Sequence, residues 1–248
     1  MSSDAAGAGS SLPAIDDRLV VPETRYEMHD GELVHVSPAD PPHAERHLQL
    51  CALIEAHTGA GFEAACDLLM RTSEIDDVAP DLSVYPEAPD PATGGRQLEQ
   101  LAFEVVSTQS LGGAGRKAAK LAARGVRRVF AIDVERSRAL EWSLALGTWS
   151  VLDAGGYITD PALEVPLPVE ALIHSAKADD AVASALVAKH NPVFEALRAE
   201  SELKGRIEGT AEAVVAVLAA RGLVLDRGER DRILGERDPA RLARWLAG

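Results

Sequence analysis

Two carboxylates and a lysine stand in an order that could bind a metal ion and act on a phosphate ester. Asp81 opens a short apolar run, Glu104 interrupts the apolar run 101–106, and Lys117 follows. A carboxylate inside a strand-like apolar run is costly unless a cation meets it. Two such acids on neighbouring strands could hold a divalent metal, and the lysine could neutralise charge on an attacked phosphate or orient a water.

The pleat of a strand decides whether the two acids can meet. In a strand over 101–106, Ala102, Glu104 and Val106 share one face. If the Asp81 strand pairs with it, both carboxylates converge at one end of the sheet. The simpler alternative is that Asp81 caps a turn while Glu104 pairs with an arginine of the basic segment that follows. The ordered set of acid, acid and lysine favours a site.

The elements that would position these residues indicate a mixed α/β core. An Asp-Gly turn at 30–31 predicts a hairpin, and the small-residue stretch 107–115 predicts a loop. A strand, a helix and a second strand after Glu104 predict a parallel pair joined by a crossover. The expected strands are 25–29, 32–36, 62–69, the run after Asp81, 101–106, 129–133, 140–144 and 149–152, and the expected helices are 43–57 and 115–124, the second capped by Gly125.

Three parts follow along the chain. Residues 1–17 read as a disordered tail, 18–175 as the α/β core, and 176–248 as a helical appendage. Asp238-Pro239 predicts an N-cap followed by proline at the first position of a last helix. The appendage carries no catalytic constellation, so we expect it to pack on the core or to pair with another copy, which predicts a homodimer.

The charge distribution limits the class of protein. The net charge is −14, and residues from Ala176 to the end carry equal numbers of acids and bases, so the core holds the whole excess. This argues against nonspecific coating of nucleic acid. One acid-free segment, 116–128, is basic, and it is either a solvated face or a phosphate contact. No apolar run reaches the length of a membrane span and no signal peptide precedes the core, so we expect a cytoplasmic protein without a membrane partner.

Three rival motifs have weaker support. His43, His47 and Cys51 follow one another at helical spacing and could form a zinc face, although the two cysteines, Cys51 and Cys66, read more simply as reduced core residues. The glycine-rich stretch 112–117 lacks the spacing of a nucleotide loop. A cysteine–histidine nucleophile would need a third, orienting residue that the sequence does not indicate.

Around Asp81, Glu104 and Lys117 the chain resembles the PD-(D/E)XK nuclease superfamily and, more narrowly, the Uma-two family of endonuclease-like proteins. The resemblance covers roughly residues 25–172. It implies a restriction-endonuclease-like fold, with a mixed central sheet and flanking helices. The matching pieces, in order, are Arg25-Tyr26-Glu27, Asp30-Gly31-Glu32-Leu33-Val34, Ser37-Pro38, His43, Pro80-Asp81-Leu82, Phe103-Glu104-Val105-Val106-Ser107, Lys117, Gly125-Val126, Ile132-Asp133 and Gly156-Tyr157.

What the resemblance implies is a Mg²⁺-dependent endonuclease acting on DNA, with Mn²⁺ as a substitute. Asp81 and Glu104, with the Val105 carbonyl, would bind the metal. The lysine that usually stands two residues after the second acid is replaced here by Val106, and Lys117 on the following helix would take its place. The weaker candidates are Lys120 as a reserve lysine, Glu32 as a further acid and His43 at the start of its helix.

The same comparison leaves a second function open. The stretch after Glu104 reads Ser107-Thr108-Gln109-Ser110, and Leu121 stands where a tyrosine often follows the lysine. These departures, with the acidic core, support an alternative to the endonuclease: a nuclease-like protein that cleaves weakly or not at all and acts as a binding module. The sequence therefore predicts a nuclease fold and a metal site, and leaves catalysis or interaction as alternatives.

Overall fold

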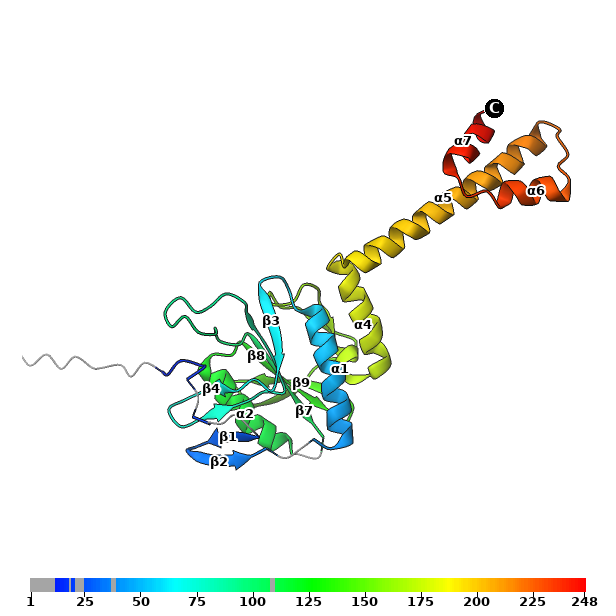
Figure 1. The fold of residues 1–248 in the computed structure, drawn as a ribbon. Helices are drawn as coiled ribbons and strands as arrows, with labels where there is room; N and C mark the ends of the chain where they lie inside the picture. Colours follow the sequence, from blue (N-terminus) through cyan, green and yellow to red (C-terminus); the bar gives the residue numbers. More distant parts are fainter. Residues whose placement is uncertain (1–11, 18, 21–24, 37–38, 108–109) are drawn as a thin grey trace, which may run out of the picture. The chain divides into compact units, whose positions relative to one another are not determined.

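The computed structural model describes residues 12–17, 19–20, 25–36, 39–107 and 110–248. The chain divides into two compact units, 1–189 and 190–248. Figure 1 shows a first unit built of strands and helices and a second unit built of helices. None of the helices in the described part of the chain combines the length and the apolarity that crossing a membrane requires.

A six-stranded mixed sheet forms the centre of the first unit. Its order is β10-β9-β8-β7-β6-β3, and the only parallel pair among the described strands joins β7 to β8, as the predicted crossover requires. The buried positions of β7 alternate between two faces, as the pleat demands. The strands are β3 (Phe62–Cys66), β6 (Leu82–Pro86), β7 (Leu101–Val106), β8 (Arg128–Asp133), β9 (Arg138–Ser143) and β10 (Thr148–Val151).

A smaller four-stranded sheet, of order β2-β1-β5-β4, lies beside the central one. It contains the predicted hairpin of β1 (Tyr26–His29) and β2 (Glu32–His35), turned by Asp30 and Gly31 at φ 53° and 81°. Both turn residues need positive φ, which explains the Asp-Gly pair. β4 (Met70–Arg71) and β5 (Asp77–Val78) complete this sheet, and β11 (Tyr157–Ile158) with β12 (Leu167–Pro168) forms a separate pair.

Helices cover both faces of the central sheet (Figure 1). On one face, Leu53 of α1 (Pro41–His57) packs in the core cluster that holds Phe103. On the other face, Leu121 of α2 (Leu111–Arg124) packs in the cluster that holds Ala102. The short helix α3 (Val169–Ile173) and α4 (Ser175–Ala188) join the α1 side. Odd-numbered β7 residues therefore face α1, and even-numbered ones, including Glu104, face α2.

Helix α2 begins earlier than the sequence predicted. Residues 107–115 were expected to form a loop, but the helix starts at Leu111, because Ser110 caps it by accepting a hydrogen bond from the Gly113 N–H. Two glycines in its first turn did not prevent this, since an N-cap satisfies donors that a helix start leaves open. The helix ends at Gly125, whose φ of 114° makes it the predicted C-cap. Residues 108–109 of the predicted loop lie outside the described residues.

The N-terminal segment differs from the predicted disordered tail where it is described. Residues 1–11 lie outside the described residues. Beyond them, Ile15 is buried in the α2-side core, and its carbonyl accepts a hydrogen bond from the Arg71 N–H. Arg71 and Arg124 also donate to the carbonyls of Asp17 and Pro13. The arginine side chains therefore hold this segment on the core.

The second unit is a small helical bundle. Its helices are α5 (Pro192–Ala220), α6 (Arg227–Leu234) and α7 (Pro239–Ala247), and Ile207, Val214 and Leu242 lie in its core. Asp238 caps α7 and proline follows at the first turn, as predicted. The division between the units differs from the predicted one at Ala176, because α4 packs against α1 and so belongs to the first unit.

The aromatic pair at the centre of the sheet gives a stability test. Phe103 and Phe130 are fully buried and stacked, with ring centroids 5.0 Å apart. We expect Phe103→Ala to lower the free energy of unfolding of the first unit by about 3–5 kcal/mol, because it leaves a cavity. Guanidinium unfolding followed by tryptophan fluorescence in a Trp245→Phe background would isolate the first unit.

Leu146 is a matched control, because its side chain is 74% exposed in the turn between β9 and β10. We expect Leu146→Ala to change the same free energy by less than about 0.5 kcal/mol. Equal effects of the two substitutions would contradict the assigned core.

Candidate active site

Glu104 and Lys117 meet between the central sheet and α2. Glu104 lies on the face of β7 that α2 covers, and Lys117 lies in the middle of that helix. The Lys117 Nζ is 3.1 Å from Glu104 Oε1 and 3.3 Å from Oε2. The structure therefore joins the second acid and the lysine that the sequence singled out, and Glu104 pairs with this lysine rather than with an arginine.

Glu27 is a third member that sequence reasoning did not place in the site. Its Oε1 lies 3.1 Å from Lys117 Nζ and accepts a hydrogen bond from the Ala79 N–H, and its Oε2 lies 2.7 Å from His29 Nε2. The sequence carried no signal for it, because Glu27 is buried while the apolar Tyr26 beside it is exposed, the reverse of what the alternation of β1 indicates. A buried acid in a hairpin strand needs a partner, and the sequence did not show which one.

Asp81 immediately precedes β6, next to Glu104. β6 pairs with β7 in the register Leu82↔Phe103, and one further step sets Asp81 beside Glu104. Its Oδ2 accepts a hydrogen bond of 2.5 Å from the Val105 N–H, and its Oδ1 lies 3.6 Å from His43 Nε2. The Asp81 carboxylate is therefore fixed to the strand that carries Glu104.

His43 is positioned by the start of α1. Asp40 caps this helix by accepting from the His43 N–H through Oδ1, while its Oδ2 accepts from the Ser107 hydroxyl just after β7. This pair of hydrogen bonds ties the first turn of α1 to the end of the strand that carries Glu104. The cap explains why a histidine in a helix reaches an acid that precedes another strand.

Three acids and one ammonium share this largely buried space. The exposed fractions of the side chains are 9% for Glu27, 3% for Glu104, 14% for Asp81 and 15% for Lys117. Burial raises the pKa of Glu104 to about 8, because Lys117 offsets only part of the desolvation and Asp81 and Glu27 add repulsion. Although burial favours the neutral amine, Glu104 and Glu27 hold the pKa of Lys117 above its ordinary value.

The other two acids keep their charge. Burial disfavours ionised Glu27, but Lys117 and His29 still hold its pKa below the ordinary value. For Asp81, the His43 contact, Lys117 and the Val105 N–H overcome burial and lower the pKa. Asp81 in turn raises the pKa of His43. At neutral pH, Glu104 is therefore the acid of this cluster that carries a proton.

This donor set fits a hard divalent cation. The three carboxylates would carry more negative charge than one ammonium neutralises, and oxygen ligands are those that Mg²⁺ prefers. Among the described residues no donor makes a well-directed hydrogen bond to Glu104 Oε1, although Lys117 is close to it. A cation would stabilise the ionised form of Glu104, which the protein alone does not favour.

The weaker sequence candidates lie differently. Lys120 pairs with Asp76 and lies 3.1 Å from Asp30 Oδ1, so its ammonium joins the β1–β2 turn to the loop before β5. Glu32 is exposed at the start of β2, where it pairs in register with His29. The backbone N–H of Val105 binds Asp81, and its carbonyl as a metal ligand stays a prediction.

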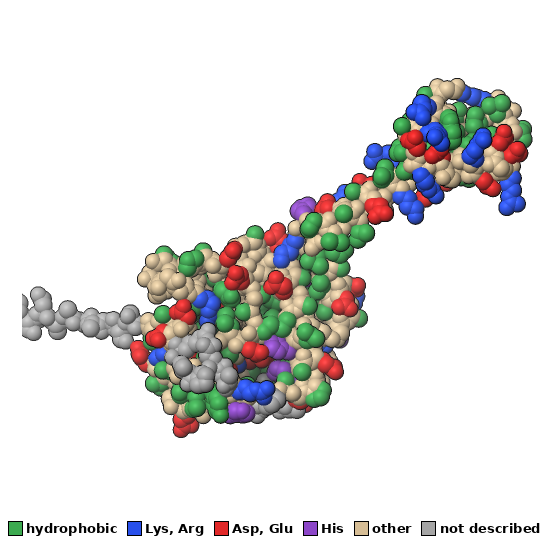
Figure 2. All heavy atoms as spheres, viewed as in Figure 1, with side chains coloured by type: hydrophobic (Ala, Val, Ile, Leu, Met, Phe, Trp, Pro, Cys, Tyr) green, Lys and Arg blue, Asp and Glu red, His purple; other side chains and the backbone are tan. Residues whose placement is uncertain are grey.

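Most basic side chains of the segment 116–128 make hydrogen bonds or ion pairs within the first unit. Arg124 donates to backbone carbonyls, Arg127 pairs with Asp160, and Arg128 pairs with Glu141 and lies 3.9 Å from Asp160. Arg116 is exposed. On the face drawn in Figure 2, acidic and basic side chains are interspersed on the first unit. The segment therefore anchors α2 and β8 more than it presents a surface to phosphates.

Side chains of the types that ligate metals also gather around His47, near Asp81. Within the described ranges, two groups of three have ligand atoms within 4.8 Å of one another, His47–Asp67–Asp81 and His47–Cys51–Cys66. Glu104 belongs to neither group. Sequence reasoning named His47 and the cysteines but missed Asp67. The distance of Asp67 from His47 and Asp81 depends on where β3 ends, which the sequence did not show.

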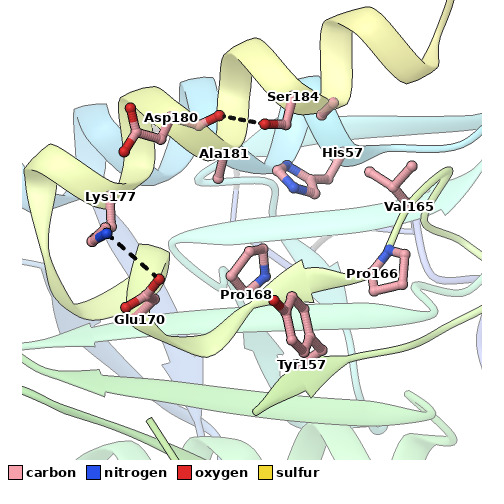
Figure 3. A pocket seen from close by; sticks show the side chains of 11 residues that line it. His57, Tyr157, Val165, Pro166, Pro168, Glu170, Lys177, Asp180, Ala181 and Ser184 are labelled. Carbon is pink, nitrogen blue, oxygen red and sulfur yellow. Dashed lines mark hydrogen bonds and ion pairs between the residues drawn. The ribbon is translucent and has the colours of Figure 1, made fainter. Parts of the chain in front are cut away.

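A separate pocket of about 380 Å³ lies between α4 and the β11–β12 pair (Figure 3). Lys177 and Glu170 on its rim are 4.0 Å apart, and His57 inside it contacts the Leu53 carbonyl through Nδ1. Burial lowers the pKa of His57, so the ring is neutral. The pocket shares no residue with the acidic cluster and does not belong to the candidate active site.

Comparison with known proteins gives one family and a fold neighbour. The Uma2 family, described as "Putative restriction endonuclease", matches residues 15–170. A similar solved structure is the "putative nuclease belonging to DUF820 from Anabaena variabilis ATCC 29413", with a TM-score of 0.51 and 16% identity over 62% of this chain and 93% of that one. A search of curated proteins finds no match. Because the family match spans more than half of the chain and includes Glu27, Asp81, Glu104 and Lys117, the chain belongs to the Uma2 family.

Proposed function

We propose that this chain is a metal-dependent endonuclease that hydrolyses phosphodiester bonds in DNA. The observation that carries the proposal is the Lys117 ammonium, 3.1 Å from both Glu104 and Glu27, beside an Asp81 that is hydrogen-bonded to the Glu104 strand. Acids of this kind, with a cation among them, suit phosphate chemistry. Membership of the Uma2 family supports the same reaction class.

Asp81, Glu104 and the Val105 carbonyl would hold Mg²⁺, and Mn²⁺ would substitute for it. When bound, such an ion polarises a phosphate oxygen and lowers the pKa of a water molecule. The backbone hydrogen bond from Val105 to Asp81 keeps the two acids in a constant relation. This arrangement supports binding without a large rearrangement of the two strands.

Lys117 would act as a permanent cation. Since two carboxylates hold its pKa above the ordinary value, it stays protonated at neutral pH and does not serve as a general base. A fixed ammonium stabilises negative charge that develops on the attacked phosphate. The helix therefore supplies the charge that the strand lacks at Val106.

His43 would be a positioning residue. Its ring lies 3.6 Å from Asp81 Oδ1, and Asp40 holds the first turn of its helix in place. It would orient the Asp81 carboxylate from the side opposite to the Val105 N–H. Glu27 would hold Lys117 in the same way, through its contact with the ammonium.

Cleavage of supercoiled plasmid DNA in Mg²⁺ or Mn²⁺ tests the proposal. We expect Lys117→Ala and Glu104→Gln each to reduce the nicking rate by roughly 100-fold or more, because each removes charge at the reacting phosphate or the metal. Arg116→Ala is the matched control, since it removes an exposed positive charge from the neighbouring position of the same helix. Equal nicking by the wild type and both site variants would point to a contaminating nuclease and end the assignment.

The raised pKa of Glu104 predicts pH-dependent metal binding. Below about pH 8 the carboxyl holds a proton that the metal must displace, so Mn²⁺ should bind more tightly as the pH rises from about 6 to 8. Glu104→Gln should weaken binding and remove most of this pH dependence, because Asp81 is already ionised. Titration calorimetry at several pH values measures the affinity for Mn²⁺. An affinity that does not change with pH in the wild type would contradict the assignment of Glu104.

A homodimer formed through the helical unit stays a proposal. Val193, Leu197 and Leu203 of α5 are exposed by 64%, 56% and 47%, which leaves apolar surface for a second copy. We expect light scattering at micromolar concentration to give the mass of two chains. A monomer mass at that concentration would refute the proposal.

A further inference from the structure

Two cysteines and a histidine meet beside the acidic cluster. The Cys51 and Cys66 Sγ atoms are 2.7 Å apart, and ligand atoms of both lie within 4.8 Å of one from His47. The spacing of α1 predicted a face of His43, His47 and Cys51. The structure groups Cys66 with His47 and Cys51, so the third ligand comes from a different element.

Helix α1 and strand β3 together build this cluster. His47 and Cys51 are four residues apart on α1, so they share one face of the helix. Cys66 is the last residue of β3, an edge strand that packs against α1. Cys51 is half-buried and Cys66 is exposed, so the cluster can be reached from solvent.

The hydrogen bond of His47 prepares it to bind a metal. Its Nε2 lies 2.7 Å from the carbonyl oxygen of Asp81. A carbonyl only accepts, so Nε2 is the donor in this contact, which leaves Nδ1 as the nitrogen that can offer a lone pair to a metal. A backbone carbonyl on the second nitrogen is the usual support of a metal-binding histidine.

We propose that Cys51, Cys66 and His47 form a site for Zn²⁺, with water as the fourth ligand. Two sulfurs and one imidazole are ligands that Zn²⁺ takes and that Mg²⁺ does not favour. On binding, each thiol loses its proton to solvent and gives a thiolate–zinc bond. With Zn–S bonds of about 2.3 Å in a tetrahedron, the sulfurs stand ~3.8 Å apart, so they separate by roughly 1 Å from their present contact.

The bound ion would join the end of β3 to α1 close to Asp81. His47 donates to the Asp81 carbonyl, and so does the Asp67 N–H, 3.2 Å away, from the residue after Cys66. The zinc site therefore supports the backbone of an acid in the candidate active site. The zinc site shares no ligand with the proposed nuclease metal, so zinc binding does not depend on that metal or on cleavage.

Cobalt binding under reducing conditions tests the site. The chain has two cysteines, so thiolate-to-Co²⁺ charge-transfer absorption reports this cluster alone. With a phosphine reductant present, we expect one Co²⁺ per chain with this absorption, and displacement by Zn²⁺. Cys51→Ser and Cys66→Ser should each abolish the absorption. His47→Gln should weaken binding by more than the ~10–100-fold that follows from losing a residue hydrogen-bonded to a metal ligand.

His43→Gln and Glu104→Gln are the controls, and both should keep the absorption. Loss of the absorption in His43→Gln, with retention in Cys66→Ser, would instead favour the face that the sequence predicted and overturn the proposal. No absorption in the reduced wild type would also overturn it. Formation of a Cys51–Cys66 disulfide in air, without Co²⁺ binding in reductant, would assign the pair to redox chemistry instead.

Discussion

The buried ammonium of Lys117 is the interaction on which the site depends. It is shared by Glu104 on the central sheet and Glu27 on the small sheet, so one charge joins α2 to both. Removing one partner from a buried ion pair costs about 3–5 kcal/mol, because the remaining charge is left without compensation. The small sheet is held to the rest of the first unit partly through this charge. The packing of the small sheet and the proposed function therefore both depend on the Lys117 side chain.

The charge balance of the cluster explains why it suits a metal. A single lysine cannot neutralise three buried acids, and the proton on Glu104 compensates for the deficit at neutral pH. A proton and a divalent cation are then alternatives at the same carboxylate. The proposed metal would therefore replace this proton, whereas a fully neutralised cluster would offer it no excess negative charge.

Asp81 connects two chemically different groups. Its carboxylate faces the Val105 N–H and His43, while its carbonyl accepts from His47 and from the Asp67 N–H. The side chain thus belongs to the oxygen-rich cluster and the backbone to the sulfur-containing one. The hydrogen-bond network around Asp81 is satisfied from both sides, so the position of this acid is well determined.

The sequence by itself determined the sheet core, the parallel β7–β8 pair, the Asp-Gly hairpin, the caps at Gly125 and Asp238, and the order of Asp81, Glu104 and Lys117. These follow from local rules of periodicity, turn conformation and strand pleat. The start of α2 escaped prediction, because glycines suggested a loop where one serine cap was enough. Only the tertiary structure decided that Glu27 joins Lys117, that Lys120 pairs with Asp76, and that Cys66 meets Cys51. Those contacts join residues far apart in the chain, and the packing of β1, α2, α1 and β3 brings them within reach of one another.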